Sequence, residues 1–149
     1  MKKKIVLVTG GFDPLHSGHI EYFKAARALG DKLVVGLNSD NWLTRKKGRP
    51  FMSLKERAAI VKELACVDDV IDFVDDDNSS CAAIMHTIEN QPGDQVVFAN
   101  GGDRTDTTTP EFERYGDSTL VEFVFGVGGN DKKNSSSWIL EDWKNPKTL

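Results

Sequence analysis

Short apolar segments alternate along this chain with segments that have the pattern of amphipathic helices, and few folds accommodate such an alternation. The apolar segments suit strands that are buried on both faces of a parallel sheet. They cover residues 5–8, 32–38, 70–74, 95–99 and 120–125. The helical patterns cover residues 20–29, 53–65 and 79–90, and a shorter helix is expected to start at Pro110. The alternation predicts an α/β fold: a single Rossmann-like, doubly wound parallel sheet of about five strands.

Length and charge narrow the classes of protein that fit. The 149 residues suit one domain, residues 1–149, with a single sizeable core. The net charge of −4 argues against a general nucleic-acid binder, which normally carries a basic excess. The apolar run that follows Lys4 is too short for a secretory signal, and no run is long enough to span a membrane. We therefore expect a cytoplasmic protein with no nucleic-acid and no membrane partner.

The segment from Gly10 to His19 lies between the first predicted strand and the first predicted helix. Gly10 and Gly11 permit positive φ angles and a close approach of a ligand to the backbone, and the free N–H groups of the helix start suit a phosphate. His16 and His19 are three residues apart, so they share one face of a helix turn, and Gly18 places no side chain between them. The segment therefore predicts an anion site that both imidazoles reach.

Two other interpretations of the histidine pair stay open: half of a zinc site, or two histidines without function at a helix start. The other zinc-ligand types in the chain are His86, Cys66 and Cys81, and their positions show no metal-binding spacing. Core packing is favoured for both cysteines, and no metal site held by the protein alone is predicted.

The sequence Gly10-Gly11-Phe12-Asp13-Pro14-Leu15-His16-Ser17-Gly18-His19 resembles the HxGH motif of the cytidylyltransferase-like nucleotidyltransferase superfamily. Within it the chain is similar, from residue 5 to about residue 143, to enzymes that make ADP-heptose from heptose 1-phosphate and to glycerol-3-phosphate cytidylyltransferases. The resemblance implies a nucleotidyltransferase domain over residues 1–149 that joins a nucleoside triphosphate to a phosphorylated small molecule and releases pyrophosphate. It also implies a homodimer.

In this chemistry a phosphate oxygen of the acceptor attacks the α-phosphorus, so positioned donors are needed and an enzyme nucleophile is not. The resemblance implies that His16 and His19 are catalytic and that Asp13 binds the substrate. It also implies nucleotide-binding roles for the motif residues Gly10, Gly11, Phe12 and Gly18. Mg²⁺ is expected to arrive with the triphosphate, because no carboxylate cluster predicts a dedicated protein site.

Four cations lie in the segment 45–50, which is expected to be a mobile loop after the second strand. A charge run on a loop is commonly only solvated, but a phosphorylated acceptor beside a triphosphate needs cations. The resemblance implies that Lys47 is a further catalytic residue. The substrate-binding residues expected in this region are Asp40, Lys46, Arg49 and Arg57. For Arg57 a salt bridge on the helix surface is the alternative.

Two later segments resemble nucleotide-binding elements of the same enzymes. Gly101-Gly102-Asp103 follows the fourth predicted strand, where it permits close approach of a base or ribose; an ordinary turn is the alternative. Ser135-Ser136-Ser137 precedes a terminal helix, where its hydroxyls and amides suit the β- and γ-phosphates; helix capping alone is the alternative. The chain departs from the family pattern at Arg104 and before the serines, where Lys132 and Lys133 are candidates for the phosphate-binding charge.

The three tryptophans are expected to pack on the sheet. They are Trp42, Trp138 and Trp143. For Trp42, a contact with a sugar or base is the alternative.

The function predicted is adenylyl transfer from ATP to a phosphorylated sugar such as heptose 1-phosphate. Ala65 stands where cytidylyltransferases carry an arginine, which favours ATP over CTP. A cytidylyltransferase acting on glycerol 3-phosphate or a similar alcohol phosphate stays open. So does a nucleotide-binding module without turnover. A nicotinamide-nucleotide or pantetheine-phosphate adenylyltransferase ranks below these, because its C-terminal element usually differs.

Overall fold

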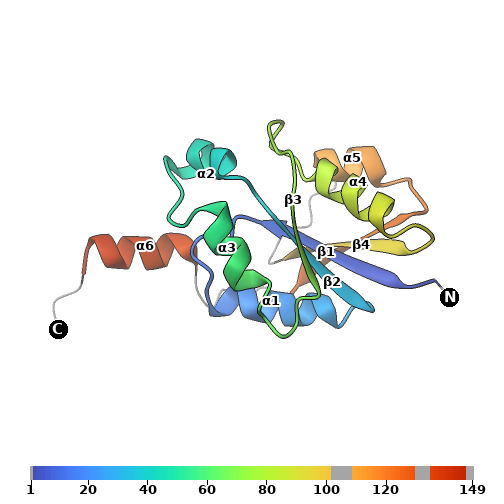
Figure 1. The fold of residues 1–149 in the computed structure, drawn as a ribbon, viewed down its shortest axis with the longest axis horizontal. Coiled ribbons are helices and arrows are strands. Elements are labelled where there is room, and N and C mark those ends of the chain that lie inside the picture. Colours follow the sequence, from blue (N-terminus) through green and yellow to red (C-terminus); the bar gives the residue numbers. More distant parts are fainter. Residues whose placement is uncertain (1, 102–108, 130–134, 147–149) are drawn as a thin grey trace.

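A computed structural model describes residues 2–101, 109–129 and 135–146, and its centre is a five-stranded parallel sheet (Figure 1). The strand order is β3-β2-β1-β4-β5, so the order reverses at β1. The strands are β1 (Lys4–Gly10), β2 (Lys32–Leu37), β3 (Asp69–Asp72), β4 (Gln95–Gly101) and β5 (Val121–Val127). The prediction of a doubly wound parallel sheet of about five strands is confirmed.

Helices cover both faces of the sheet. On one face α1 (Ser17–Arg27) and α3 (Leu54–Val61) contribute Phe23, Ala26 and Val61 to a buried cluster. On the other face α4 (Cys81–Asn90) and α5 (Pro110–Tyr115) close a second cluster. The remaining helices are α2 (Asp40–Lys47) and α6 (Ser136–Lys144).

The central strand β1 shows why the strand segments are apolar throughout. Val6 and Val8 belong to the cluster under α1 and α3, whereas Ile5 and Leu7 belong to the cluster under α4. All four side chains have 0% exposure. Successive residues of a strand face opposite sides, so a strand that is covered on both faces needs apolar residues at every position.

Helix α2 corrects one sequence-based expectation. Residues 45–50 were expected to form a loop, but Asp40–Lys47 is helical. Ser39 caps the helix by accepting a hydrogen bond from the Trp42 N–H, and Gly48 ends it with a φ of 94°. Because α2 contributes only Leu43 to the interior, its sequence lacks the apolar period that predicts a helix. The caps and the basic last turn are the signals that were present.

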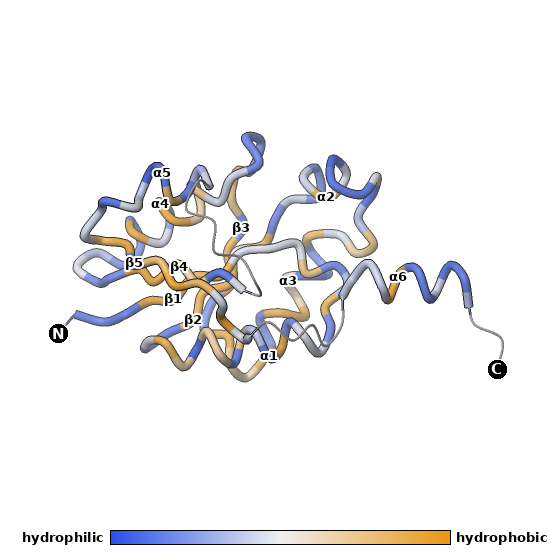
Figure 2. Tube along the Cα trace, turned by 180° about the vertical axis from the view of Figure 1, so that it is seen from behind, coloured by the Kyte–Doolittle hydropathy of each residue, from blue (hydrophilic) through white to orange (hydrophobic). Residues whose placement is uncertain are grey.

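Helix α6 corrects a second expectation. It extends away from the helices that cover the sheet, as Figures 1 and 2 show. None of its nine residues, all within the described ranges, is buried. Trp138 is 50% exposed and Trp143 is 76% exposed, so the prediction that these two tryptophans pack on the sheet is wrong.

Within the described residues, no helix has both the length and the apolar character that crossing a membrane requires.

The two isoleucines Ile84 and Ile60 provide a matched test of this core. Ile84 of α4 has 0% exposure and Ile60 of α3 has 41%. We expect Ile84→Ala to lower the free energy of unfolding by about 2–5 kcal/mol, because it removes buried methylene groups and leaves a cavity. Ile60→Ala is expected to cost about 1 kcal/mol or less. Urea denaturation followed by circular dichroism measures both, and equal losses would contradict the assignment of α4 to the core.

Candidate active site

A cavity of 270 Å³ opens at the carboxyl edge of the sheet, beside the segment that follows β1. Ligands of open α/β sheets bind at this edge, where the strand order reverses. The wall is built from the β1–α1 segment, from α2 and from the start of α6. The residues are Gly11, Phe12, Asp13, His19, Trp42, Leu43, Lys46, Lys47, Ser136, Ser137 and Leu140.

His16 and His19 cap the start of α1 reciprocally. The Gly18 N–H donates to His16 Nδ1 at 3.0 Å, and the His16 N–H donates to His19 Nδ1 at 3.2 Å. The two rings stack with centroids 3.7 Å apart and an angle of 26° between their planes. An imidazole that accepts at Nδ1 carries its proton at Nε2. The cap therefore fixes the tautomer of both rings and makes each Nε2–H a donor.

The surroundings of His19 keep its ring neutral. Burial, and secondarily the neighbouring His16, lower the pKa of His19 from 6.5 to about 3. Phe12 packs edge-on against the His19 ring with centroids 4.9 Å apart. A neutral ring with an Nε2–H can donate to a phosphate oxygen without taking up a proton first.

Gly10 and Gly11 serve packing and not backbone conformation. Both lie outside the positive-φ region, so the expectation of positive φ at these glycines is wrong; Phe12 has the positive φ, 51°. A Cβ on Gly10 would lie 2.9 Å from the Phe12 ring, and one on Gly11 would lie 2.8 Å from Leu43 Cδ2. The missing side chains make room for Phe12 beside His19 and for α2 beside the cavity.

Asp13 binds protein groups with its carboxylate. It is 2% exposed and accepts hydrogen bonds from the N–H groups of Phe51 at 2.6 Å and Met52 at 2.7 Å. The Lys47 ammonium lies 3.1 Å from the same carboxylate and donates to the Asp13 carbonyl. The Asp13 carboxylate thus fixes residues 51–52 by hydrogen bonds and holds Lys47 at the cavity wall by an ion pair.

Arg57 is buried and links three segments of the chain through hydrogen bonds. Its side chain has 0% exposure, so the alternative of a salt bridge on the helix surface is wrong. The guanidinium donates to the carbonyls of Gly11 at 3.0 Å, Asn38 at 2.8 Å and Met52 at 3.0 Å. It also pairs with Asp40 Oδ1 at 2.8 Å. Arg57 and Asp40 were expected to bind substrate; the structure places both outside the cavity wall, where they hold the wall together.

Asp75 is a supporting residue that sequence reasoning missed. Asp75 opens a run of three aspartates, residues 75–77, a composition typical of a solvated loop, but it is only 1% exposed. Its carboxylate accepts from the Ser39 N–H at 2.8 Å, the Ser39 hydroxyl at 2.6 Å and Asn38 Nδ2 at 3.0 Å. Burial opposes its charge, but these hydrogen bonds hold the pKa of Asp75 below its ordinary value. The signal available in the sequence was the polar pair Asn38-Ser39 at the end of a buried strand.

The serine segment reaches the cavity from the far end of the chain. Ser135 caps α6 by accepting from the Trp138 N–H at 3.0 Å, and the Ser136 hydroxyl donates to the Pro14 carbonyl at 2.8 Å. Ser136 and Ser137 line the cavity. The structure therefore brings this segment to the histidine motif, 122 residues earlier in the chain.

The other predicted residues lie partly at the cavity and partly away from it. Gly18 lies in the first turn of α1, and Gly101 ends β4 with its backbone against the Tyr22 ring. Lys46 lies 4.7 Å from the centroid of the Trp42 ring, and both residues line the cavity. Arg49 lines a neighbouring cavity. Gly102, Asp103, Arg104, Lys132 and Lys133 lie outside the described residues.

The strand order reverses at β1, and the helix that follows β1 begins at a histidine cap. This arrangement defines a Rossmann-like protein with a candidate anion site. A family model described as cytidylyltransferase-like matches residues 7–141, and the chain belongs to that family. The identification from the HxGH motif is therefore confirmed.

Curated relatives agree with this assignment. The bifunctional protein HldE of Pelobacter propionicus is 39% identical over 148 residues, which cover 93% of this chain and 28% of that protein. The protein of the same name from Helicobacter pylori strain HPAG1 is 53% identical over 77 residues, which cover 50% of this chain and 17% of that protein. The chain thus spans less than a third of the length of these relatives.

Solved structures share the fold. The lipopolysaccharide core biosynthesis protein of Thermoplasma volcanium superposes with a TM-score of 0.63 at 28% identity, covering 83% of this chain and 95% of that one. The NadR protein, solved with NAD and AMP-PNP, has a TM-score of 0.63 at 17% identity, covering 97% of this chain and 42% of that one. The second likeness is one of fold alone.

The pKa of His19 gives a direct test of the site. Since this pKa is about 3, we expect the His19 ring signals in an NMR titration to stay constant between about pH 5 and pH 8. The unfolded chain takes up this proton near its ordinary pKa of 6.5, so the free energy of unfolding should fall as the pH drops below that value. His19→Asn should weaken that fall. A His19 titration midpoint above about pH 5 would contradict the neutral, donating ring.

Proposed function

We propose that this chain transfers AMP from ATP to a phosphorylated sugar such as heptose 1-phosphate and releases pyrophosphate. The observation that carries the proposal is the pair of stacked imidazoles whose Nδ1 atoms are occupied by the helix cap. Two Nε2–H donors, fixed by the backbone, suit the oxygens of a phosphate on which negative charge increases.

The proposed reaction is an in-line displacement at phosphorus. A phosphate oxygen of the acceptor bonds to the α-phosphorus, and the bond from that phosphorus to the bridging oxygen of the β-phosphate breaks. His16 and His19 stabilise the charge on the phosphoryl oxygens and on the leaving pyrophosphate. Because the acceptor oxygen is already ionised, no general base is needed. Mg²⁺ enters with the triphosphate as part of the substrate.

The residues that line the cavity with His19 have roles that follow from their positions. Lys47 supplies a positive charge for the acceptor phosphate, and its ion pair with Asp13 holds it at the wall until that phosphate arrives. The α6 start offers the N–H groups of Ser136 and Ser137 and the hydroxyl of Ser137 to the tail of the triphosphate, while the Ser136 hydroxyl donates to Pro14. Gly11 and Phe12 line the same cavity.

The preference for ATP over CTP rests on resemblance. The relatives that match over most of the chain share the name of a bifunctional protein, which supports one activity for the matched part and another for the rest. Ala65 precedes the amino end of β3, whereas the cavity lies at the carboxyl edge. Its substitution for an arginine therefore supports the choice of nucleotide only through family likeness.

Pyrophosphate release separates the proposed function from its alternatives. The measurement uses ATP and CTP, each with heptose 1-phosphate, other sugar 1-phosphates and glycerol 3-phosphate, in the presence of Mg²⁺. We expect release with ATP and a sugar 1-phosphate. Release with CTP and glycerol 3-phosphate would instead identify a cytidylyltransferase. Binding of a nucleotide without release across the panel would favour a binding module.

Substitution by asparagine isolates the chemical role of the histidines. Asparagine is a good N-cap residue, so His16→Asn keeps the cap of α1 while removing the Nε2–H. We expect His16→Asn and His19→Asn each to lower kcat about a hundredfold to a thousandfold, with the circular dichroism spectrum unchanged. The exposed His86 supplies the control, since His86→Asn should leave kcat unchanged. A loss of less than about tenfold in both site variants would contradict the mechanism.

A further inference from the structure

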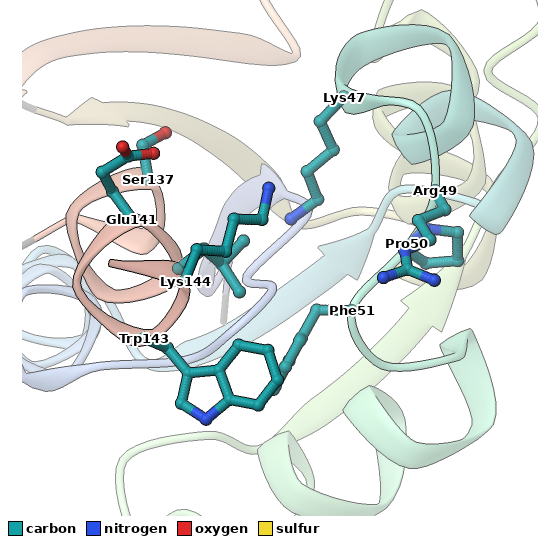
Figure 3. Close-up of a pocket in the computed structure, with 9 residues that line it drawn as sticks. Lys47, Arg49, Pro50, Phe51, Ser137, Glu141, Trp143 and Lys144 are labelled. Carbon is teal, nitrogen blue, oxygen red and sulfur yellow. The ribbon is translucent and has the colours of Figure 1, made fainter. Parts of the chain in front are cut away.

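A second cavity, of 510 Å³, lies between the segment after α2 and helix α6. It adjoins the cavity that His19 lines. Figure 3 shows the Phe51 and Trp143 rings toward one end and the Lys47 ammonium toward the other. Lys47, Ser137 and Leu140 line both cavities, so the two spaces meet at these residues. The volume lies in the range of about 300–1,000 Å³ that is usual for small-molecule sites.

The position of Lys47 determines what the second cavity can hold. If Lys47 binds the acceptor phosphate, that phosphate lies between the two cavities, with the α-phosphorus on the side of His19. The remainder of the acceptor then extends from Lys47 away from His19, which is into the second cavity. A smaller cavity of 260 Å³ is lined by Trp42, Arg45, Lys46 and Asn78 and does not include Lys47.

The lining of the second cavity suits a polyhydroxylated ring. Phe51 is 55% exposed and Trp143 is 76% exposed, so both offer open aromatic surface for the C–H face of a sugar. Glu141 is a carboxylate that accepts hydrogen bonds from hydroxyl groups but would repel a second phosphate. Arg49 and Lys144 keep the cavity positive, which favours entry of an anionic molecule.

We propose that this second cavity binds the sugar ring of the acceptor and that Trp143, Phe51 and Glu141 determine its specificity. The inference rests on the proposed function, because it takes the acceptor phosphate to lie at Lys47. It assigns to α6 two roles on successive turns: its start at Ser136 and Ser137 faces the nucleotide, and its last turn, with Glu141 and Trp143, faces the acceptor. A cavity that binds the sugar ring favours sugar phosphates over short alcohol phosphates such as glycerol 3-phosphate.

This assignment also accounts for an unusual property of α6. A helix with two tryptophans normally buries part of them against its own protein. In α6 the Trp143 ring instead borders the second cavity at the same end as Phe51, where a ligand ring would cover both.

Two tryptophan variants test the proposal in the full chain. We expect Trp143→Ala to raise the KM for heptose 1-phosphate about tenfold or more, while the KM for ATP changes less than about twofold. Trp138→Ala is the matched control: it lies on the same helix, is half-exposed and lines neither cavity, so it should change neither KM. Glu141→Gln should raise the KM for heptose 1-phosphate more than the KM for glycerol 3-phosphate.

Other outcomes would overturn the proposal. An unchanged KM for heptose 1-phosphate in Trp143→Ala would show that the Trp143 ring does not contact the acceptor. A raised KM for ATP with an unchanged KM for the acceptor would assign the cavity to the nucleotide.

Failure of the proposed function would look different, because the unaltered chain would then release no pyrophosphate with any acceptor. Equilibrium binding of heptose 1-phosphate, followed by saturation-transfer NMR, still tests the cavity in that case. Binding that Trp138→Ala retains and Trp143→Ala loses supports the sugar site. Equal binding by both variants, or none by the unaltered chain, overturns it.

Discussion

The candidate site depends on one buried guanidinium. Arg57 sits on α3, yet its donors end on carbonyls of the segments that follow β1 and β2 and on the carboxylate at the start of α2. A guanidinium keeps its charge at every accessible pH, so its burial requires that these acceptors stay in place. Packing of α3 on the sheet is therefore coupled to the arrangement of the loops that form the cavity wall. A change in the core beneath α3 would therefore reach the site through the Arg57 side chain, and also through the hydrogen bond from the Leu54 N–H to Asp40.

The charged residues of this site form a buried group and an exposed group, and the two groups have different roles. Asp13, Arg57 and Asp75 are nearly inaccessible, and protein N–H groups, carbonyls and partner charges occupy their hydrogen-bonding atoms. Lys46, Arg49 and Lys144 are exposed and border cavities. Lys47 belongs to both groups, because it pairs with a buried carboxylate while it faces a cavity. The first group gives the cavity its shape, and the second gives it its charge.

The sequence predicted the sheet and the histidine motif because both depend on local pattern. Apolar runs and helix periods identify β1 to β5, and the spacing of His16 and His19 already implies a shared helix face. Helix α2 was not predicted because it buries a single residue. The exposure of Trp143 was not predicted because the packing of a terminal helix depends on residues far away in the sequence. The role of Arg57 could not be inferred either, since its acceptors lie up to 46 residues away in the chain. Residue type predicted charge here, and only tertiary structure decided what that charge contacts.

The reciprocal cap of His16 and His19 has a consequence for how the site comes into being. The same hydrogen bonds that start α1 also orient the two rings, so the donors acquire their geometry at the moment the first helical turn forms. Fraying of that turn would therefore release both imidazoles together. A phosphate held by both rings would in turn slow the hydrogen exchange of the Gly18 amide, joining occupancy of the site to the local stability of one helix end.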